Sequence, residues 1–276
     1  MTLSPVRQAA VHVLLAVTAA LFLFPVLYVV AVSLRPAGQG LTAGLLSGEI
    51  SFSHYETLLS GRRFPVAIAN TAITALGGAV LTAATCTLAA YGLSRGEPTR
   101  LQRWILNSFL LLMMLPGLTN IIPLYKLASD LGLLNTYTAL IVSFGGLGVP
   151  LGVWIMKGFF DAIPREIEEA AAIDGASRWQ TLGRVIVPIA TPAVLANLLI
   201  NIVYNWNNFF LPLMFTTQAD RKVATVALFD YQVAYANTQN ELVAAACVLI
   251  MIPPVLMFIV MRRHFMSGLA EGSMKG

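Results

Sequence analysis

The sequence predicts an all-α integral membrane protein, a six-transmembrane helical bundle with a short helix on its cytoplasmic side. Three observations predict this class. Hydrophobic residues make up 57% of the 276 residues and charged residues 11%, whereas soluble domains carry about 25% charged residues. Six apolar segments reach the roughly 20 residues that a helix needs to cross a bilayer. The alternating ten-residue pattern of membrane β-strands is absent from the sequence, so backbone polar groups must be satisfied within helices.

The first apolar segment follows Arg7 and is expected to stay in the protein as a membrane span. It is longer than the apolar region of a signal peptide, and residues 33–36, Ser-Leu-Arg-Pro, do not form a small-x-small cleavage site. We expect all six spans to form one transmembrane domain, residues 1–276, with a polar loop at 161–184. The predicted spans cover approximately residues 9–34, 66–93, 104–127, 136–160, 185–215 and 242–261.

Basic residues predict which side of the membrane each loop faces. If both termini lie on one side, that side carries 11 of the 17 lysine and arginine residues. The positive-inside rule then places both termini and the 161–184 loop in the cytoplasm. The eleven residues are Arg7, Arg95, Arg100, Arg103, Lys157, Arg165, Arg178, Arg184, Arg262, Arg263 and Lys275.

Two predicted external loops are long, at about residues 35–65 and 216–241. The second carries Phe229, Tyr231 and Tyr235 among polar residues. It is either a docking surface or an ordinary tether with interfacial aromatic residues, and the sequence leaves both interpretations open.

The third and fourth spans contain residues that weaken a helix at membrane depth. The third carries LPGLTNIIP, residues 115–123, which predicts a kink and offers the polar group of Asn120. The fourth carries FGGLGVPLG, residues 144–152. Interrupted helices often line a substrate cavity, but small residues equally allow close packing of helices. Both interpretations remain open for these segments.

The fifth span carries asparagines at helical spacing. Asn197, Asn201, Asn205 and Asn208 follow one another at intervals that place them along one helical face. One hypothesis is that these amides bind the hydroxyl groups of a neutral sugar, with the ring of Trp206 stacked on the sugar face. The alternative is that they bond to neighbouring helices. The candidate pathway residues are Asn201, Asn205, Trp206, Asn208 and Asn120.

A charged segment, EEAAAIDGASRWQTLGRV, fills residues 168–185 of the predicted cytoplasmic loop. Carboxylates near the start of a helix and the alanines that follow them favour a helix. Gly175 suits the left-handed conformation that ends a helix, and Ser177 with Gln180 forms a capping box that begins another. Alanines let a partner approach closely and carboxylates pair with basic groups, so the segment predicts a docking surface. A lipid-bound helix would instead be basic, with large apolar residues.

This segment resembles the EAA loop of ABC-importer permeases, whose pattern is roughly E-A-A-x-x-D-G-A followed by I-x-L-P. Here residues 169–176 read EAAAIDGA, and residues 186–188 read IVP. LNTYTALIV (134–142), WNNFFLPL (206–213) and SGLAEGSMKG (267–276) are similar to the carbohydrate-importer branch, on the side of its maltose-system G-type subunit. Asn208 stands where many of these relatives carry a glutamate.

The resemblance implies a transport subunit rather than an enzyme. It implies that the EAA helix docks into a separate ATPase subunit. The implied partners are a second, non-identical permease, two ATPase subunits and an extracellular or periplasmic solute-binding protein. The implied location is a bacterial or archaeal cytoplasmic membrane. The chain has no G-x-x-x-x-G-K-[ST] motif, so we expect ATP and Mg to bind the ATPase, with no cofactor in this chain. The implied coupling residues are Glu168, Glu169, Ala170, Ala171, Asp174 and Gly175.

Other functional classes lack the residues that they need. Two cysteines and three scattered histidines give neither a disulfide framework nor a metal site, and no basic run with interleaved aromatic residues suggests a nucleic-acid partner. A secondary transporter or channel working alone remains the alternative, although no span centre carries Asp, Glu, Lys or Arg for ion coupling. An intramembrane hydrolase would need paired Asp or a Ser/His pair within the spans. The sequence leaves open which sugar or polyol is carried.

Overall fold

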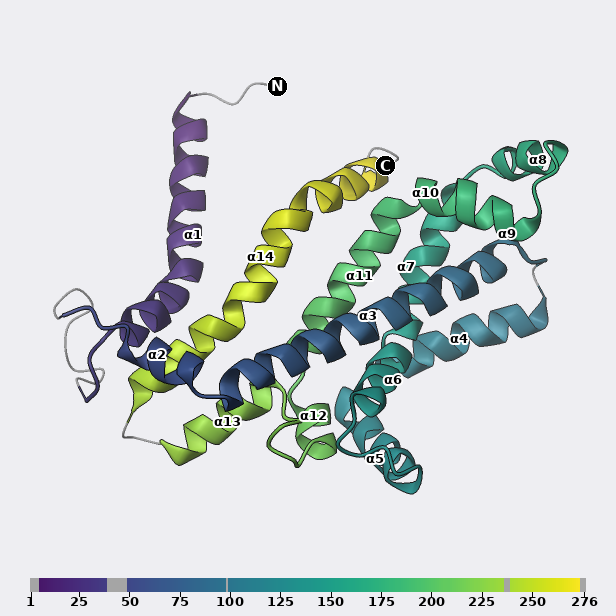
Figure 1. Cartoon of the computed structure of the whole chain (residues 1–276). Coiled ribbons are helices and arrows are strands. Elements are labelled where there is room, and N and C mark those ends of the chain that lie inside the picture. Colours follow the sequence, from purple (N-terminus) through teal and green to yellow (C-terminus); the bar gives the residue numbers. More distant parts are fainter. Residues whose placement is uncertain (1–4, 39–48, 98, 236–238, 274–276) are drawn as a thin grey trace. The chain divides into compact units, whose positions relative to one another are not determined.

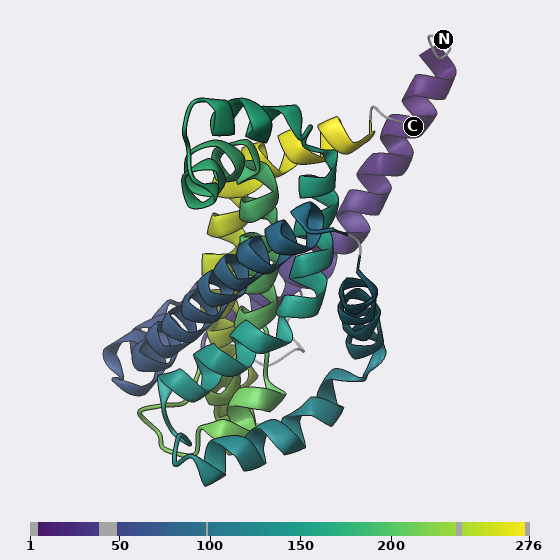
Figure 2. The ribbon, with the colours of Figure 1, turned by 90° about the vertical axis from the view of Figure 1, so that its right-hand side faces the viewer.

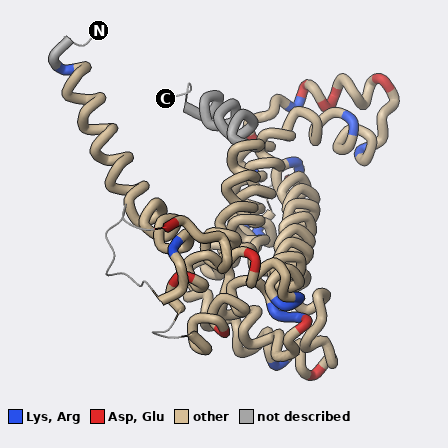
Figure 3. The backbone as a smooth tube through the Cα atoms, turned by 60° about the vertical axis from the view of Figure 1, so that its left-hand side comes forward, with Lys and Arg blue, Asp and Glu red and all other residues tan. Residues whose placement is uncertain are grey.

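The computed structural model describes residues 5–38, 49–97, 99–235 and 239–273, and the side chains from 7 to 260 within these ranges. Over this part of the chain the regular structure is entirely helical, with no β-strand, which confirms the predicted all-α class (Figure 1). Figure 3 shows long helices with few charged residues and a charged hairpin near residues 160–185. This distribution agrees with apolar spans joined by a charged loop.

Three helices are long and apolar enough to cross a membrane unaided: α1 (Pro5–Ser33), α3 (Arg63–Arg95) and α14 (Asn240–Ser273). They correspond to the predicted first, second and sixth spans. The apolar part of α14 ends at Val260. For these three spans, the length and composition of the apolar segments were sufficient to find the helix.

The other candidate spans are bent pairs of helices. The third joins α4 (Arg100–Met114) to η1 (Gly117–Asn120) and α5 (Ile121–Asp130) through a bend of 106°, which Figure 2 shows plainly. The bend falls at Pro116, which has no N–H to donate, and the preceding Leu115 is extended with ψ 132°. The kink predicted from LPGLTNIIP is therefore confirmed.

The fourth span joins α6 (Tyr137–Leu147) to α7 (Val149–Ala162), with a bend of 48° near Gly148. The fifth bends by 76° at Ala190, between α9 (Arg178–Thr181), η2 (Leu182–Ile186) and α10 (Val187–Ile189) on one side and α11 (Thr191–Trp206) on the other. With each bent pair counted as one span, the described residues hold six candidate spans, as predicted.

The fifth span differs from the predicted continuous range 185–215. Its long helix, α11, runs from Thr191 to Trp206, and residues 210–215 form a separate short helix, α12 (Phe210–Phe215). Hydropathy averaged over a window does not detect these breaks, because Ala190 is apolar and Asn207 and Asn208 lie between apolar stretches. Proline at positions 188, 192 and 212 starts new helical segments more readily than it continues old ones.

The chain forms two compact units. One comprises residues 1–65 and 227–253, the other residues 66–226 and 254–276. The prediction of a single domain, residues 1–276, stays a prediction. The second unit holds the predicted coupling segment and the asparagine row, and it contains two buried apolar clusters, around Phe160 and Ile186 and around Phe144 and Phe215.

In the first unit, α2 (Ser53–Ser60) is bonded to the chain that follows α1. The hydroxyls of Ser33 and Tyr55 lie 2.6 Å apart, and a ring nitrogen of His54 lies 3.1 Å from the carbonyl oxygen of Arg35. The predicted external loop at 216–241 contains a helix, α13 (Ala224–Ala234). Two of the aromatic residues noted in this loop, Tyr231 and Tyr235, stack on each other.

Candidate functional site

The predicted cytoplasmic segment folds as two short helices joined by a tight turn. α8 (Glu166–Ile173) ends at Gly175, whose φ of +82° is the predicted left-handed conformation. The amide of Ala176 donates to the carbonyl of Ala171 at 2.9 Å, which closes the helix end. The capping box of Ser177 and Gln180 is also present at the start of α9. These local predictions are confirmed.

One side of this segment is open to solvent. Glu169, Ala170, Asp174 and Gly175, all predicted coupling residues, are exposed. Two large apolar side chains accompany them: Ile173 is 87% exposed and Trp179 is 74% exposed. Large apolar side chains beside carboxylates are typical of a protein–protein contact. Sequence reasoning missed both residues, although a tryptophan in a polar loop was a usable signal.

Glu168 and Ala171 face the other way, although they were predicted to belong to the same surface. Ala171 is buried, and the Glu168 side chain is only 18% exposed. Nε of Arg95, at the end of α3, donates to Oε1 of Glu168. The hydroxyl of Tyr91 donates to Oε2 at 2.9 Å. The two adjacent glutamates are thus separated: Glu169 faces outward and Glu168 is bound within the chain.

Arg95 also contacts the chain that leads into α8. Its Nη2 donates to the carbonyl oxygen of Ile163 at 3.1 Å, and its Nη1 to the hydroxyl of Ser94 at 3.2 Å. Ser94 donates to Oδ1 of Asp161 at 2.6 Å, and Lys157 to Oδ2 of Asp161 at 2.6 Å. We call this set the Arg95 network: Tyr91, Ser94, Arg95, Lys157, Asp161 and Glu168.

The asparagine row of α11 lies inside the helix packing. Asn197, Asn201 and Asn205 are only 1%, 5% and 3% exposed. Nδ2 of Asn201 donates to the carbonyl oxygen of Asn197 at 2.8 Å and to its Oδ1 at 2.7 Å. Nδ2 of Asn205 donates to the carbonyl oxygen of Ala75, on α3, at 3.2 Å. These are contacts within and between helices, as in the alternative interpretation of the row.

Glycines of the neighbouring helices make room for these amides. A Cβ on Gly148 would lie 2.2 Å from Oδ1 of Asn201, and a Cβ on Gly152 would lie 2.9 Å from Oδ1 of Asn197. On α3, a Cβ on Gly78 would lie 3.0 Å from Nδ2 of Asn205. The glycines of the fourth span therefore serve close packing, one of their two open interpretations. The burial of Asn201 and Asn205 in this chain favours the second interpretation of the row, contact between helices, and their place on a substrate pathway stays a prediction.

The remaining candidate pathway residues differ in exposure. Trp206 is buried, at 3% exposed. Oδ1 of Asn208 accepts from the amide of Leu211 at 3.2 Å, so this side chain caps the start of α12. Asn120 is partly exposed on η1. Asn208 therefore has a structural contact at the position where relatives were expected to carry a glutamate.

The open face of α11 carries residues that sequence reasoning missed. Tyr204 is 50% exposed, and Asn207, one turn further on, is also exposed. A Cβ on Gly117 would lie 4.0 Å from the hydroxyl oxygen of Tyr204, so η1, which carries Asn120, approaches this face. The missed signal was a tyrosine near the end of the helix, offset from the buried row and followed by Asn207.

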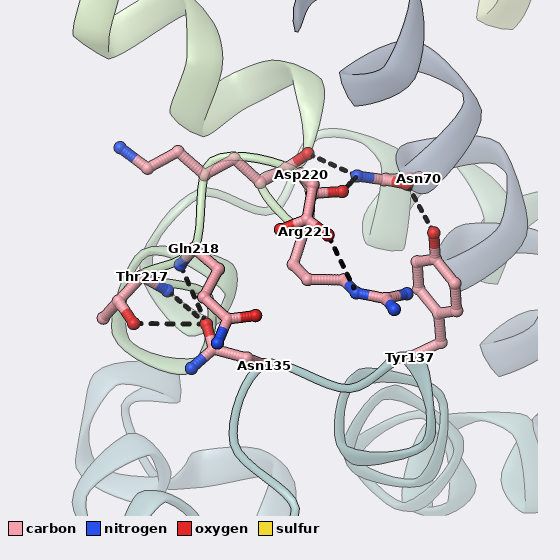
Figure 4. Close-up of polar contacts among 8 residues, drawn as sticks. Asn70, Asn135, Tyr137, Thr217, Gln218, Asp220 and Arg221 are labelled. Atoms are coloured by element: carbon pink, nitrogen blue, oxygen red, sulfur yellow. Dashed lines mark hydrogen bonds and ion pairs between the residues drawn. The ribbon is translucent and has the colours of Figure 1, made fainter.

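A second polar cluster surrounds Asn70, near the start of α3 (Figure 4). Its Nδ2 donates to the carbonyl oxygens of Asp220 and Lys222, each at 2.9 Å. Its Oδ1 accepts from the hydroxyl of Tyr137 at 2.7 Å. The guanidinium carbon of Arg221 lies 4.7 Å from the centre of the Tyr137 ring, a cation–π contact.

Asn135 fixes the same loop from the other side, as Figure 4 shows. Its Oδ1 accepts from the amides of Thr217 at 2.7 Å and Gln218 at 3.0 Å, and its own φ is +62°. We call Asn70, Asn135, Tyr137 and residues 217–222 the Asn70 cluster. Asn135 and Tyr137 lie in the quoted LNTYTALIV segment, but nothing in the sequence indicated which loop they bind.

A family model described as "Binding-protein-dependent transport system inner membrane component" matches residues 84–270. Similar curated proteins include a trehalose/maltose transport system permease of Thermococcus litoralis, 32% identical over 92% of each chain. A melibiose/raffinose/stachyose import permease of Bacillus subtilis is 29% identical over 96% of each chain. One similar solved structure is a chain of a bacterial ABC transporter involved in the import of the acidic polysaccharide alginate. It superposes on this chain with a TM-score of 0.81 and 25% sequence identity, over 96% of this chain and 99% of that one.

Proposed function

Because this chain belongs to the family of inner membrane components of binding-protein-dependent transport systems, and is a permease subunit of an ABC importer rather than an enzyme, we propose that it imports a sugar. It forms half of the translocation pathway and takes its energy from a separate ATPase. Relatives named for trehalose, maltose, melibiose, raffinose and stachyose support a neutral di- or oligosaccharide as the substrate.

The exposed side of α8 is the surface that meets the ATPase, and we therefore call α8 the coupling helix. The observation that carries this proposal is the exposure of Ile173, Glu169 and Asp174 on and directly after a helix closed by the left-handed Gly175, with Trp179 exposed on the following helix, α9. Removing two large apolar side chains from water favours association. Ala170 is small enough to let a partner helix approach. Glu168 and Ala171 hold the coupling helix from inside.

The pathway residues of this subunit lie on the open face of α11 and the adjoining η1. Tyr204 offers a ring on which a sugar can stack, and the side chains of Asn207 and Asn120 offer amides. The buried Asn201 and Asn205 instead fix α11 against its neighbours.

The complete importer contains a second, non-identical permease, two ATPase subunits and an extracellular or periplasmic solute-binding protein. The family description, with its dependence on a binding protein, supports the last of these. ATP and Mg bind to the ATPases. The distribution of basic residues supports an orientation with both termini in the cytoplasm, so that the coupling helix faces the ATPases.

The test is co-purification followed by transport. The tagged chain, expressed with its native partners, should retain ATPase subunits during purification. The complex should then be placed in liposomes with the binding protein and offered trehalose, maltose, raffinose and stachyose. We expect uptake of at least one of these sugars, and only when MgATP is present on the ATPase side. We expect Trp179→Ala to reduce the retained ATPase about tenfold, as loss of a buried anchor implies. Trp104→Ala, which removes an equally exposed tryptophan at the start of α4, is the matched control. Uphill uptake by the purified chain alone would support the stand-alone transporter instead.

A further inference from the structure

Two adjacent carboxylates of the coupling helix have different surroundings. Glu169 is exposed, whereas the Glu168 side chain is 18% exposed and meets Arg95, itself only 13% exposed. An ion pair that is largely shielded from water is weakened little by salt. Removing one partner leaves the other charge shielded and unpaired, which destabilises the protein. Glu168 is therefore not available to a partner protein without breaking this pair.

The Glu168 carboxylate is hydrogen-bonded to α3. Its two oxygens accept from Arg95 and Tyr91, which lie one turn apart near the end of α3. The Tyr91 ring also packs edge-on against Phe160 of α7, with centroids 5.9 Å apart. Arg95 adds the bond to the carbonyl oxygen of Ile163, in the linker that precedes the coupling helix. The end of α3 is thus bonded both to the coupling helix and to the chain that leads into it.

Apolar packing alone would not hold this geometry. Ala171 is buried and Ile167 packs against the cluster around Phe160, but apolar contacts are non-directional and permit sliding. Charge-assisted hydrogen bonds from a guanidinium to a carboxylate are directional and strong. Glu168 makes such a bond from the coupling helix to Arg95 of α3.

We infer that the Arg95–Glu168 pair, supported by Tyr91, transmits the movement of the coupling helix to α3, so that Glu168, Arg95 and Tyr91 are positioning residues for transport. This inference rests on the proposed function, because it requires an ATPase that moves the coupling helix. Glu169 meets the partner and Glu168 passes the resulting displacement inward. When the pair is missing, the ATPase still docks and hydrolyses ATP, but less of the movement reaches the membrane helices.

The experiment measures sugar transported per ATP hydrolysed by the complete importer in liposomes, with the sugar that the panel identifies. We expect Glu168→Gln and Arg95→Met each to lower this ratio about tenfold, the size expected from losing one hydrogen bond to a charged group. ATPase retention during purification should remain at the wild-type level. A variant that only destabilises the protein lowers uptake and hydrolysis together and leaves the ratio unchanged.

Two controls and one combination sharpen the result. Glu97→Gln and Arg100→Met remove exposed charges on the same predicted side of the membrane and should keep the wild-type ratio. If the two residues act through each other, Glu168→Gln combined with Arg95→Met should lower the ratio no further than the stronger single change. If Arg95→Met does not accumulate in the membrane, Tyr91→Phe, which keeps the ring against Phe160 and removes only the hydroxyl, should lower the ratio about threefold.

Three results would overturn the inference. One is a wild-type ratio of sugar transported per ATP in both single variants, Glu168→Gln and Tyr91→Phe. Another is a double variant whose loss equals the product of the single losses, because the residues would then act independently. The third is loss of the ATPase subunits from Glu168→Gln but not from the control Glu97→Gln, which would place Glu168 on the partner surface. Failure of the proposed function looks different, since no ATPase would then be retained by the wild-type chain.

Discussion

The two polar regions on α3 hold their neighbours by different chemistry. The Asn70 cluster uses neutral amides that bond to the backbone, with Asn70 reaching two carbonyl oxygens and Asn135 two amides. The Arg95 network uses charged side chains that bond largely to other side chains. Asn70 and Arg95 are 25 residues apart on one helix, about 37 Å along its axis. One region fixes the path of a loop, and the other holds a helix that a partner is proposed to move.

This difference separates stability from coupling. Backbone-directed amide bonds do not depend on the charge of either group, so the Asn70 cluster is suited to a fixed structure. Charge-assisted bonds between side chains are directional and strong, so the Arg95 network is suited to passing a displacement from one element to another. Variants of the first region should therefore change the free energy of unfolding, and variants of the second should change transport per ATP.

The largest effect on stability is expected from Asn70→Leu. The change keeps the branched shape and the number of side-chain heavy atoms but removes the donor shared by two carbonyl oxygens and the acceptor of the Tyr137 hydroxyl. We expect a loss of about 3 kcal/mol in the free energy of unfolding, measured as a lower midpoint of thermal unfolding in detergent. The exposed Asn107→Leu on α4 is the matched control and should change it by less than about 0.5 kcal/mol. A changed ratio of sugar transported per ATP in the folded fraction of Asn70→Leu would contradict the separation of stability from coupling.

Gly175→Val should affect coupling strongly with a smaller effect on stability. A β-branched residue is strained at φ +82°, at a cost of about 1–3 kcal/mol, so the turn between the coupling helix and α9 should open and displace Glu169 and Trp179. We expect uptake to fall at least tenfold while the protein still inserts in the membrane. Gly158→Val, at an exposed position of α7 where a Cβ meets nothing within 4 Å, should transport normally. Wild-type uptake by Gly175→Val would count against the coupling role of this turn.

The smallest effect is expected from an exposed ion pair. Lys126 and Asp130 on α5 lie 3.2 Å apart, but their side chains are 77% and 61% exposed. Such pairs contribute about 0.3–0.5 kcal/mol, so Lys126→Ala should leave both the unfolding midpoint and the transport ratio within error. A clear effect would mean that charge itself, rather than shielding from water, distinguishes the Arg95 network.

Local signals in the sequence predicted local structure correctly. The six apolar segments, the kink at Pro116, the left-handed Gly175 and the capping box at Ser177 each depend on residues within a few positions of one another, and each is present in the structure. The fifth span was drawn as one range because hydropathy averages over its breaks. The helix, turn and capping box of residues 166–181 were predicted for a related reason, since their pattern is contiguous in the sequence.

Contacts between distant residues were not predictable from one sequence. Glu168 and Arg95 are 73 positions apart, so nothing local showed that Glu168 faces inward. Asn70 and Asp220 are 150 positions apart. The spacing gave the shared face of Asn197, Asn201 and Asn205 correctly, but Asn208 lies beyond the end of α11, so its predicted place on this face was wrong. The spacing also did not show that Gly148 and Gly152 lie opposite the row. The glycines had two open interpretations, a weakened helix or close packing of helices, and the structure shows which side chains occupy the space they leave.

The fit between Asn201 and Gly148 has a practical consequence for building chimaeras with related permeases. A Cβ at position 148 would come within 2.2 Å of the Asn201 oxygen, so α11 cannot be exchanged for a foreign segment without regard to the helix that faces it. A donor segment that carries asparagine at 201 fits glycine at 148, whereas alanine there would force the side chains of Asn201 and Thr82 to move. Segments 144–152 and 191–206 should accordingly be transplanted together, as one cassette.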